Sequence, residues 1–468
     1  MVSFSKPKLG VLGLIHGGYE QVFPGILERQ KKYAQEVVDS VLDSVDVDLY
    51  FPNIAIDRKS IEDTVRDFNS KNLDGIIIIL LAYSFGTWIV RALQENKLPI
   101  ALTVIQPEQV VGDDWEELDF TVNQAIHGAQ DNSNAIVRSG FKCQFFAGNR
   151  HEPRFSQFIL NFGKAAMVFQ HLRRMRVAVI GRLSGMNDVV ADEMAFFRKI
   201  GPECVYESIG SVYLHMESLT KDEIDKRVEY DKTIFDMDPN LSYESHAYAI
   251  KMYLGLKKFL EERKYDAFTL NFEVLGEDGR FKQLHLLAAS HLMADGYGYA
   301  AEGDSICAAM VSAAHCLGNM DANFTEMYAM DFEKKAIICC HAGEGNWATC
   351  RKDIKPKLID RYFGEGGLGN PPTPIFTPQI GPTVFTSLAP LSGDKFRLVL
   401  AKGKILNKSD LRGCEMPYIF WSPNSGIEKC VENWMKNGGT HHEVVSLGDI
   451  SERWRMLADM LDVEFVEV

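Results

Sequence analysis

An uninterrupted apolar run near the N-terminus constrains the fold of this chain more than any other feature. Residues 75–83 read GIIIILLAY, with four consecutive isoleucines and no alternation between apolar and polar side chains. A strand of this kind is buried on both faces, which is typical of a parallel sheet covered by helices. The run is also far shorter than the roughly 20 apolar residues that a membrane-spanning helix needs. It therefore predicts a central strand of an α/β domain.

Similar runs recur on both sides of this strand, separated by segments with helical patterning. They include KLGVLGLIH at 8–16, PIALTV at 99–104 and KCQFFAG at 142–148. Strands that alternate with helices in this way predict a doubly wound parallel sheet. We assign this N-terminal α/β domain to residues 1–172.

The rest of the chain shows two further patterns. A second alternation of strands and helices begins with MRVAVIG at 175–181 and predicts a central α/β domain at 173–325. After it, strand-like runs such as FRLVLAKGKIL at 396–406 are separated mainly by Gly and Pro. That pattern is typical of an antiparallel sheet or a small barrel. We therefore expect a C-terminal β-rich domain at 326–468.

The amino-acid composition limits the possible classes of function. At 468 residues the chain exceeds what one hydrophobic core usually supports. Its 64 acidic and 50 basic side chains give a net charge of −14, which disfavours nucleic acid or an anionic membrane as a partner. Nine cysteines without a C-x-x-C pair are typical of reduced thiols in the cytosol. We expect a cytoplasmic protein that acts on a small molecule.

Side chains suited to a divalent cation recur in the second half of the chain. Glu302 lies in a glycine-flanked turn, Glu326 follows 24 residues later, and His341 follows after 15 more. Near the C-terminus stand two adjacent histidines, His441 and His442. Carboxylate and imidazole groups are ligands for such ions, and they bind them without thiols. Together these residues predict a metal site with coordination positions left for water or a substrate.

Each of these residues also has an ordinary structural explanation when it is taken alone. Glu302 fits a turn or a helix cap, Glu326 a solvated face, and His341 a hydrogen-bonded core position. Adjacent residues in a strand point to opposite faces, so at most one of His441 and His442 is expected to face a site. Only their joint occurrence favours the metal site.

Seven patches along the chain resemble the L-arabinose isomerase family of metal-dependent aldose-ketose isomerases, more than its relative L-fucose isomerase. Their order and spacing make the resemblance specific, and it extends over nearly the whole chain. It implies a doubly wound N-terminal domain, a second α/β domain and a β-rich C-terminal domain, the same division that the patterns predict. The patches are VNQAIHG (122–128), FTLNFEVL (268–275), LMADGYGYAAEGD (292–304), NFTEMY (323–328), ICCH (338–341), QIGPTVFTSL (379–388) and GGTHHEVVS (438–446).

The resemblance also implies a site. Glu302, Glu326, His341 and His442 would be the metal ligands, with His442 rather than His441 because the family's ligand is the second histidine of the pair. The implied metal is Mn²⁺, with Mg²⁺ or Co²⁺ as substitutes. The implied assembly is a homo-oligomer, a trimer or hexamer, whose subunits share the site. Matching substrate contacts are Gln124, His127, Met186, Phe272, Phe324, Tyr328 and Ile380.

Two segments depart from the family pattern. The family's first loop has Gln followed by His, Leu and Tyr, whereas here Ile15 precedes His16, two glycines and Tyr19. An amide is thus missing and the tyrosine is displaced, although we still expect His16 and Tyr19 to contact substrate. Residues 341–350, HAGEGNWATC, are glycine-rich where the family is apolar. The sugar therefore stays open: L-arabinose, an L-fucose or D-arabinose type, a 6-deoxyhexose or a sulfonated hexose.

The expected chemistry needs two carboxylates close to an open-chain sugar. In an enediol route one carboxylate removes the C2 proton and returns it to C1. We assign Glu326 as the base and Glu302 as its acid partner. The opposite assignment and a metal-assisted hydride shift both remain open. A non-catalytic sugar-binding protein is the alternative from another class, because two α/β lobes also describe such binders.

Overall fold

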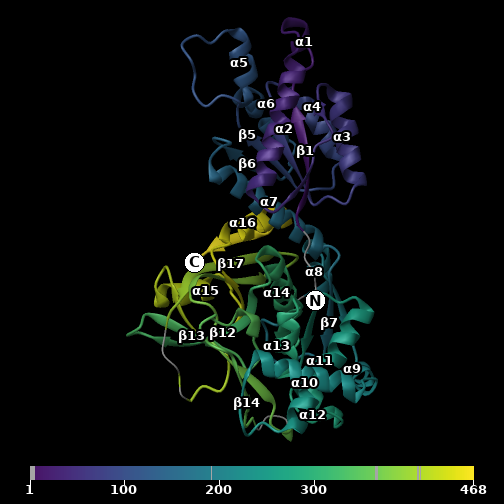
Figure 1. Ribbon diagram of the computed structural model, residues 1–468, viewed down its shortest axis with the longest axis vertical. Helices are drawn as coiled ribbons and strands as arrows, with labels where there is room; N and C mark the ends of the chain where they lie inside the picture. The colour runs from purple at the N-terminus through teal and green to yellow at the C-terminus, as the bar shows by residue number, and fades with distance from the viewer. Residues whose placement is uncertain (1–5, 191, 364–366, 408–410, 412) are drawn as a thin grey trace. The chain divides into compact units, whose positions relative to one another are not determined.

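The computed structural model describes residues 6–190, 192–363, 367–407, 411 and 413–468 (Figure 1). Within these ranges the chain groups into two compact units. The N-terminal unit runs up to Gln170 and also includes Arg453–Met460, whereas the second unit comprises His171–Glu452 and Leu461–Val468. The separation of residues 173–325 from 326–468 into two domains stays an interpretation of the sequence.

The N-terminal unit contains a parallel sheet in the order β2-β1-β4-β5-β6, with β3 also paired to β1. Its central strand is the isoleucine-rich run, and every residue of that strand is buried. The strands are β1 (Lys8–Leu14), β2 (Asp48–Tyr50), β3 (Ile54–Ala55), β4 (Gly75–Leu80), β5 (Ile100–Val104) and β6 (Gln144–Ala147). The helices are α1 (Tyr19–Val22), α2 (Ile26–Ser44), α3 (Arg58–Ser70), α4 (Gly86–Glu95), α5 (Glu117–Asn123), α6 (Ala125–Arg138), α7 (Pro153–Leu172) and α16 (Ser451–Leu461).

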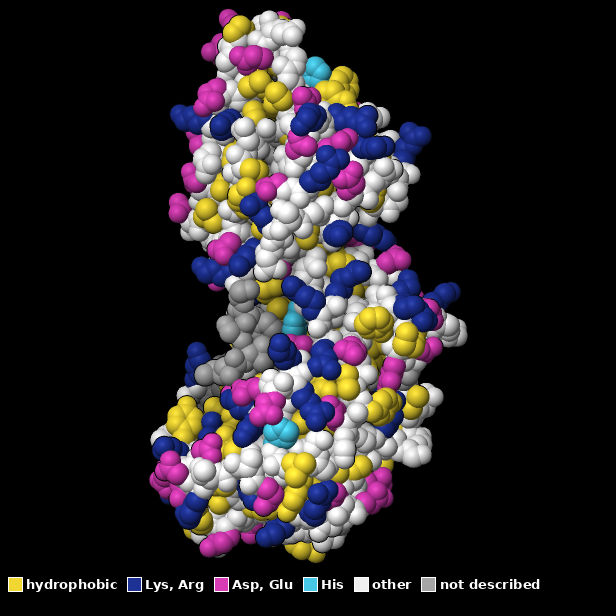
Figure 2. Space-filling model, turned by 90° about the vertical axis from the view of Figure 1, so that its right-hand side faces the viewer, with side chains coloured by type: hydrophobic (Ala, Val, Ile, Leu, Met, Phe, Trp, Pro, Cys, Tyr) yellow, Lys and Arg dark blue, Asp and Glu magenta, His cyan; other side chains and the backbone are white. Residues whose placement is uncertain are grey.

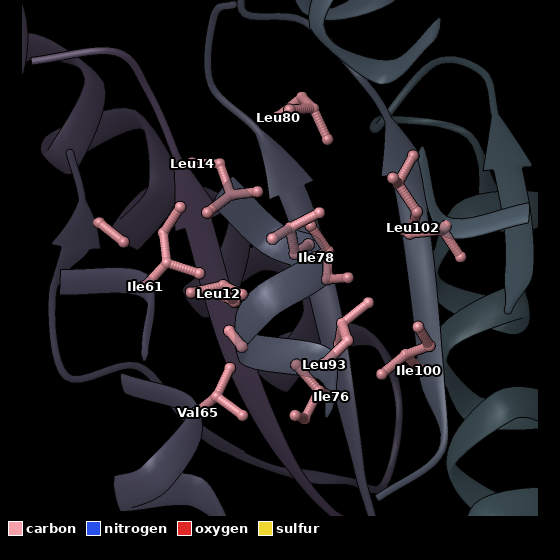
Figure 3. Close-up of a cluster of buried hydrophobic side chains, with 14 of the residues drawn as sticks. Leu12, Leu14, Ile61, Val65, Ile76, Ile78, Leu80, Leu93, Ile100 and Leu102 are labelled. Carbon is pink, nitrogen blue, oxygen red and sulfur yellow. The ribbon is translucent and has the colours of Figure 1, made fainter. Parts of the chain in front are cut away.

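The core of this unit forms where helices meet the sheet (Figure 3). Leu12 and Ile78, on neighbouring strands, pack with Ile61 and Val65 of α3 and with Leu93 of α4. These helical residues are buried because they recur on one face of an amphipathic helix. The doubly wound architecture therefore follows from the two periodicities in the sequence.

The second unit begins with another parallel sheet, in the order β11-β10-β7-β8. Its strands are β7 (Arg176–Ile180), β8 (Glu203–Tyr206), β10 (Ala267–Leu270) and β11 (Gly298–Ala301). Its helices are α8 (Glu193–Lys199), α9 (Ile209–Glu217), α10 (Lys221–Ile234), α11 (Tyr243–Arg263), α12 (Glu273–Asp278), α13 (Leu286–Ala294) and α14 (Ser305–Leu317). A small sheet in the order β15-β14-β9 and a short helix η1 (Trp347–Thr349) complete this region, with β9 (Asp236–Met237), β14 (Lys357–Asp360) and β15 (Pro372–Ile375).

The remaining strands close into an antiparallel barrel. In the described residues its order is β16-β19-β12-β13-β18-β17, and pairing between β17 and β16 completes the ring. β20 (Glu464–Glu467) pairs in parallel with Arg397–Leu400 of β17, on the edge where Gly403–Ile405 pair with β18. The strands are β12 (Ala322–Asp331), β13 (Ala336–Cys340), β16 (Gly381–Pro390), β17 (Phe396–Ile405), β18 (Tyr418–Pro423) and β19 (His442–Leu447), with α15 (Ile427–Lys436) between β18 and β19. The expected fold class, two doubly wound sheets followed by a barrel-like region, is confirmed.

Helix α14 joins the second parallel sheet to the barrel. It packs against β11 on one side and β19 on the other, and all its residues are buried. Small residues allow this close packing, since a Cβ at Gly298 would lie only 2.1 Å from the backbone oxygen of Ala308. The helix thus fixes the end of β11 beside the barrel strands.

The face in Figure 2 carries Lys and Arg side chains interspersed with Asp and Glu. Among the helices of the described ranges, none combines the length and apolarity needed to cross a bilayer.

Candidate metal centre

Two architectural rules bring the predicted donors together. Glu302 comes directly after β11, at the carboxyl edge of the parallel sheet where ligands of α/β domains bind. Glu326 lies on β12 directly opposite His442 on β19, and it also pairs with Cys340 at the end of β13. His341 is the next residue after that strand. The structure therefore gathers all four donors that the sequence singled out.

The distances define one compact cluster. His442 Nε2 lies 3.5 Å from Glu302 Oε2 and 3.5 Å from Glu326 Oε1. His341 Nε2 lies 3.9 Å from Glu326 Oε1. Ligand atoms fall within 4.8 Å of one another in two groups that share His442, one with Glu326 and His341 and the other with Glu302 and His441. Such spacing suits donors that surround a cation.

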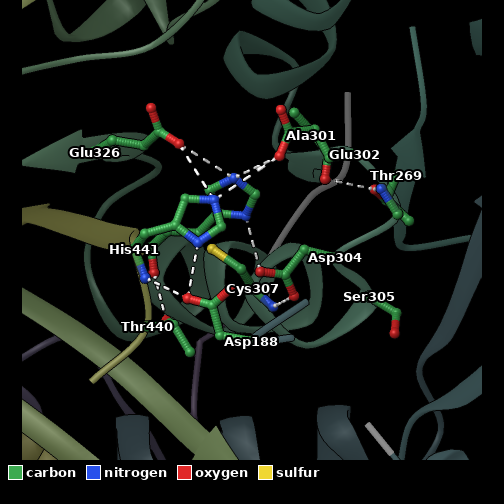
Figure 4. A network of polar contacts seen from close by, with 12 residues as sticks. Asp188, Thr269, Ala301, Glu302, Asp304, Ser305, Cys307, Glu326, Thr440 and His441 are labelled. Atoms are coloured by element: carbon green, nitrogen blue, oxygen red, sulfur yellow. Dashed lines mark hydrogen bonds and ion pairs between the residues drawn. The ribbon is translucent and has the colours of Figure 1, made fainter. Parts of the chain in front are cut away.

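His441 also faces this cluster (Figure 4). Its Nε2 lies 3.4 Å from Glu326 Oε1 and 3.8 Å from Glu302 Oε2, and its ring centroid is 4.0 Å from that of His442. The expectation that only one of the two histidines would face a site is wrong. Strand alternation does not apply because β19 begins at His442, and His441 still belongs to the preceding turn.

Each of the three imidazoles contacts a carboxylate through its Nδ1 atom, and none of these carboxylates was predicted from the sequence. The Nδ1 atoms of His341, His441 and His442 lie 2.9, 2.8 and 2.9 Å from carboxylate oxygens. Such contacts orient an imidazole and decide which nitrogen faces the metal. The only local signals are short spacings, two residues from Glu302 in one case and three from His341 in another. The three carboxylates are, in the same order, Glu344, Asp188 and Asp304.

Two of these carboxylates have further roles. Asp304 caps α14 by accepting from the backbone N–H of Cys307 at 2.9 Å. Glu344 accepts a hydrogen bond of 2.8 Å from the hydroxyl of Tyr299, which in turn lies 3.0 Å from His285 Nε2. The ring orientations are thereby tied to buried, fixed elements.

The backbone at Glu302 is strained. Its φ is +65°, a left-handed conformation that a side chain with a Cβ seldom adopts. Gly303 follows at φ +96°, where a Cβ would lie 2.5 Å from the Cα of Arg182. Strain of this kind is concentrated at functional sites, because the surrounding fold must hold it in place.

The cluster is strongly charged. Burial opposes ionisation of Glu302, but the nearby imidazoles of His441 and His442 outweigh it and lower the pKa of this carboxyl to about 2. The hydrogen bond to Asp188 and the neighbouring Glu302 raise the pKa of His441 to about 9. Burial lowers the pKa of His442, yet its contacts with Asp304 and the two glutamates raise it well above the usual value. Cationic charge is therefore favoured at this point.

A divalent cation fits the atoms that face the cluster. Glu302 Oε2 and His442 Nε2 are buried and have no hydrogen-bond partner among the described residues. Buried polar atoms are normally satisfied, so two unpartnered atoms that face each other indicate room for a partner between them. Carboxylate oxygens suit hard ions such as Mn²⁺ and Mg²⁺, and imidazoles suit softer divalent ions, so this mixed set without a thiol is compatible with several divalent cations.

The predicted substrate contacts fall into two places. In the second unit, Phe324 is buried with its ring centroid 4.7 Å from that of His341 and 4.9 Å from that of His442. Tyr328 is 59% exposed on β12, and Met186, Phe272 and Ile380 are half-buried in or beside loops.

The other predicted contacts lie in the N-terminal unit. Gln124 donates to the hydroxyl of Tyr19 at 3.0 Å and lies 3.3 Å from Nδ1 of His127. His16 stacks on Trp88 with ring centroids 5.4 Å apart. The four residues therefore gather at the carboxyl edge of the first sheet.

Comparisons with known proteins point to one family. Residues 185–320 match a model described as the L-arabinose isomerase central domain, and residues 321–464 match the L-arabinose isomerase C-terminal domain. The L-arabinose isomerase of Clostridium beijerinckii is 28% identical, covering 97% of this chain and 93% of the relative. That of Leuconostoc mesenteroides is 25% identical, covering 95% and 96%.

One solved structure is only weakly similar to this chain. A periplasmic solute-binding protein from Actinobacillus succinogenes with bound D-allose covers 67% of this chain and 92% of its own, at 11% identity and a TM-score of 0.19. The two family models, in contrast, jointly span more than half of this chain, and the relatives extend over nearly all of it. The chain therefore belongs to the L-arabinose isomerase family and is an aldose-ketose isomerase.

Proposed function

We propose that this isomerase interconverts a free aldose and its ketose, of the L-arabinose to L-ribulose type, with a bound divalent cation. The observation that carries the proposal is the convergence of Glu302, Glu326, His341 and His442 on one cluster, which contains buried polar atoms without a hydrogen-bond partner among the described residues. These four residues would hold the cation, and Mn²⁺ is the ion we propose. When bound, it would stabilise negative charge on the sugar oxygens.

The protein's own carboxylates would move the proton. Glu326 is the proposed base, taking the proton from C2 and returning it to C1 of the open-chain sugar. Glu302 would act as the partner at the neighbouring oxygen. Phe324, packed against two of the imidazoles, would exclude water from the reacting atoms.

The proposed sugar site extends beyond these residues. By family resemblance we propose contacts from His16, Tyr19, Gln124, His127, Met186, Phe272, Phe324, Tyr328 and Ile380. We also propose a cytoplasmic homo-oligomer, a trimer or hexamer with shared sites. Light scattering on the purified protein would test the number of subunits. In the described part of the chain all nine cysteines are free, which supports a reducing compartment.

A second sugar class has support from the first loop. Ile15 stands where the family has an amide, and the next residue, His16, stacks on Trp88 and meets Phe85 edge-on at a centroid distance of 4.9 Å. Aromatic surfaces bind apolar substituents better than hydroxyl groups. This favours a sugar with a methyl end, such as a 6-deoxyhexose, as the alternative substrate.

A substrate screen tests the proposal directly. Free pentoses, free hexoses, 6-deoxyhexoses and sulfonated hexoses are incubated with the protein, with Mn²⁺ and after chelation, and ketose is measured. We expect conversion of at least one free aldose only when Mn²⁺ is present. Binding of a sugar without conversion would favour a non-catalytic binder, and conversion unaffected by chelation would exclude the cation.

A further inference from the structure

Asp188 makes an unusual double contact with His441. The residue lies in the loop between β7 and α8, and its Oδ2 accepts the backbone N–H of His441 at 2.9 Å. The same oxygen lies 2.8 Å from Nδ1 of the His441 ring. One carboxylate oxygen therefore fixes both the main chain and the side chain of this histidine, as Figure 4 shows.

This double contact determines the state of the ring. A backbone N–H is always a donor, so the atom that meets it at 2.9 Å must act as an acceptor. The same acceptor faces Nδ1, so Nδ1 carries a hydrogen. With its hydrogen on Nδ1, the ring can offer the Nε2 lone pair to a cation, because a bound hydrogen on one nitrogen sets the metal-facing nitrogen of histidine ligands.

The free nitrogen points at the donor cluster. Its distances to Glu326 and Glu302, 3.4 and 3.8 Å, bracket the 3.5 Å distances of His442 Nε2 to the same carboxylates. His341 Nε2, an expected ligand, is farther from Glu326, at 3.9 Å. By distance, His441 is therefore as well placed as the implied ligands.

We propose that Asp188 is a positioning residue that presents His441 as a fifth donor to the cation site. The proposal rests on the cation site of the proposed function and adds a ligand to the four that the family resemblance implies. The neighbouring backbone supports it: Thr440 donates its N–H to Ser387 Oγ at 3.1 Å and its hydroxyl to the carbonyl of His442 at 2.8 Å. The main chain on both sides of His441 is thus held.

A simple surface ion pair is the competing explanation. The Asp188 and His441 side chains are 35% and 36% exposed, and exposed pairs contribute about 0–1 kcal/mol to stability. Such a pair would not affect cation binding. Mn²⁺ affinity therefore separates the two explanations.

The test measures Mn²⁺ binding rather than turnover. Metal-free protein is titrated with Mn²⁺ and the free ion is followed by electron paramagnetic resonance. We expect Asp188→Ala and His441→Ala each to weaken binding about tenfold or more, the range found when groups that orient metal ligands are removed. The double variant is expected to bind no more weakly than either single variant, because both changes remove the same donor.

Two matched variants sharpen the result. Asp188→Asn keeps an oxygen that can accept from both N–H groups, so we expect its Mn²⁺ affinity to stay within about threefold of wild type. Asp192→Ala, in the same loop, removes the cap of α8 without touching the cluster and is expected to bind Mn²⁺ like wild type. Loss of affinity in Asp188→Asn equal to that in Asp188→Ala would refute positioning.

The outcomes distinguish failure of the fifth donor from failure of the proposed cation site. If wild type binds no Mn²⁺, the cation site itself fails. If wild type binds Mn²⁺ and His441→Ala binds it equally well, only the fifth donor is refuted. Losses that add in the double variant would also overturn the proposal. Circular dichroism checks the fold of each variant, and His441→Ala tests the same donor should Asp188→Ala not fold.

Discussion

Glu326 and His442 occupy directly opposed positions on β12 and β19. Opposed residues of an antiparallel pair project to the same face with Cβ atoms about 4.5–5.5 Å apart. Strand register alone therefore brings this carboxylate and this imidazole together. A slip of one residue would turn one of them to the other face of the barrel wall.

Replacing the proposed base tests the role of this pair. Glu326→Gln preserves shape but cannot accept a proton, so we expect kcat to fall by about 10²–10⁴ while the fold survives. Ketose formation and circular dichroism measure the two effects. Glu333→Gln, in the exposed turn after β12, is the matched control and should retain full activity. Near wild-type turnover in Glu326→Gln would mean that another residue is the base.

Removal of the cation is expected to lower stability as well as activity. A ligand that binds only the folded state adds about 2.7 kcal/mol when present at 100 times its Kd. Chelation should therefore lower the unfolding temperature in a calorimetric scan, and added Mn²⁺ should restore it. Identical scans with and without chelator would contradict a cation bound at this centre.

The strained turn at the site makes a separate prediction. Gly303→Ala places a Cβ 2.5 Å from the Cα of Arg182 at a φ of +96°, so we expect a loss of at least about 1–3 kcal/mol in the free energy of unfolding. Urea denaturation measures it. Gly413→Ala, where a Cβ meets open space, serves as the control. Equal stability of both variants would show that the turn adapts without cost.

A buried network away from the site predicts a pH effect. Asp231 is fully buried, with its carboxylate 3.0 Å from His246 Nε2, His291 Nε2 and Arg227 Nε. Burial raises the pKa of Asp231, but these partners outweigh it and hold the pKa well below 3.8. Because the folded-state pKa is lowered, its contribution to stability is present above about pH 4 and is lost as pH falls further.

We expect Asp231→Asn to lower the free energy of unfolding by about 3–5 kcal/mol at pH 7, the effect of breaking a buried ion pair. The difference from wild type should shrink as pH falls below 4. Urea denaturation at several pH values measures it. A difference that stays constant down to pH 3 would mean that the charge of Asp231 is not what stabilises the network.

Much of the fold follows from local sequence patterns. The run at β4 predicted a strand buried on both faces, and that strand forms the centre of the first parallel sheet. The pairing of β12 with β19 was not predictable, because more than a hundred residues separate them and nothing local encodes the register. The return of α16 to the N-terminal unit likewise has no local signal.

The candidate site was likewise only partly predictable from the sequence. The joint occurrence of Glu302, Glu326, His341 and the histidine pair predicts a metal site, although each residue alone fits an ordinary structural role, and the family resemblance selects His442 from the pair. His441 was misjudged because the strand rule was applied to a turn residue, and Asp188 was missed because its importance depends on a loop from another element. Carboxylates that orient metal-facing histidines can be recognised only when the tertiary contacts are known.

Barrel closure also sets the order of events during synthesis. β19 is the last of the ring strands along the chain, and it fills the gap between β16 and β12. Glu302, Glu326 and His341 are therefore all made before the strand that carries His442 exists. A chain that ends before β19 lacks one ring strand and one of the four proposed ligands, so the complete proposed cation site forms only after the C-terminal strand has been synthesised.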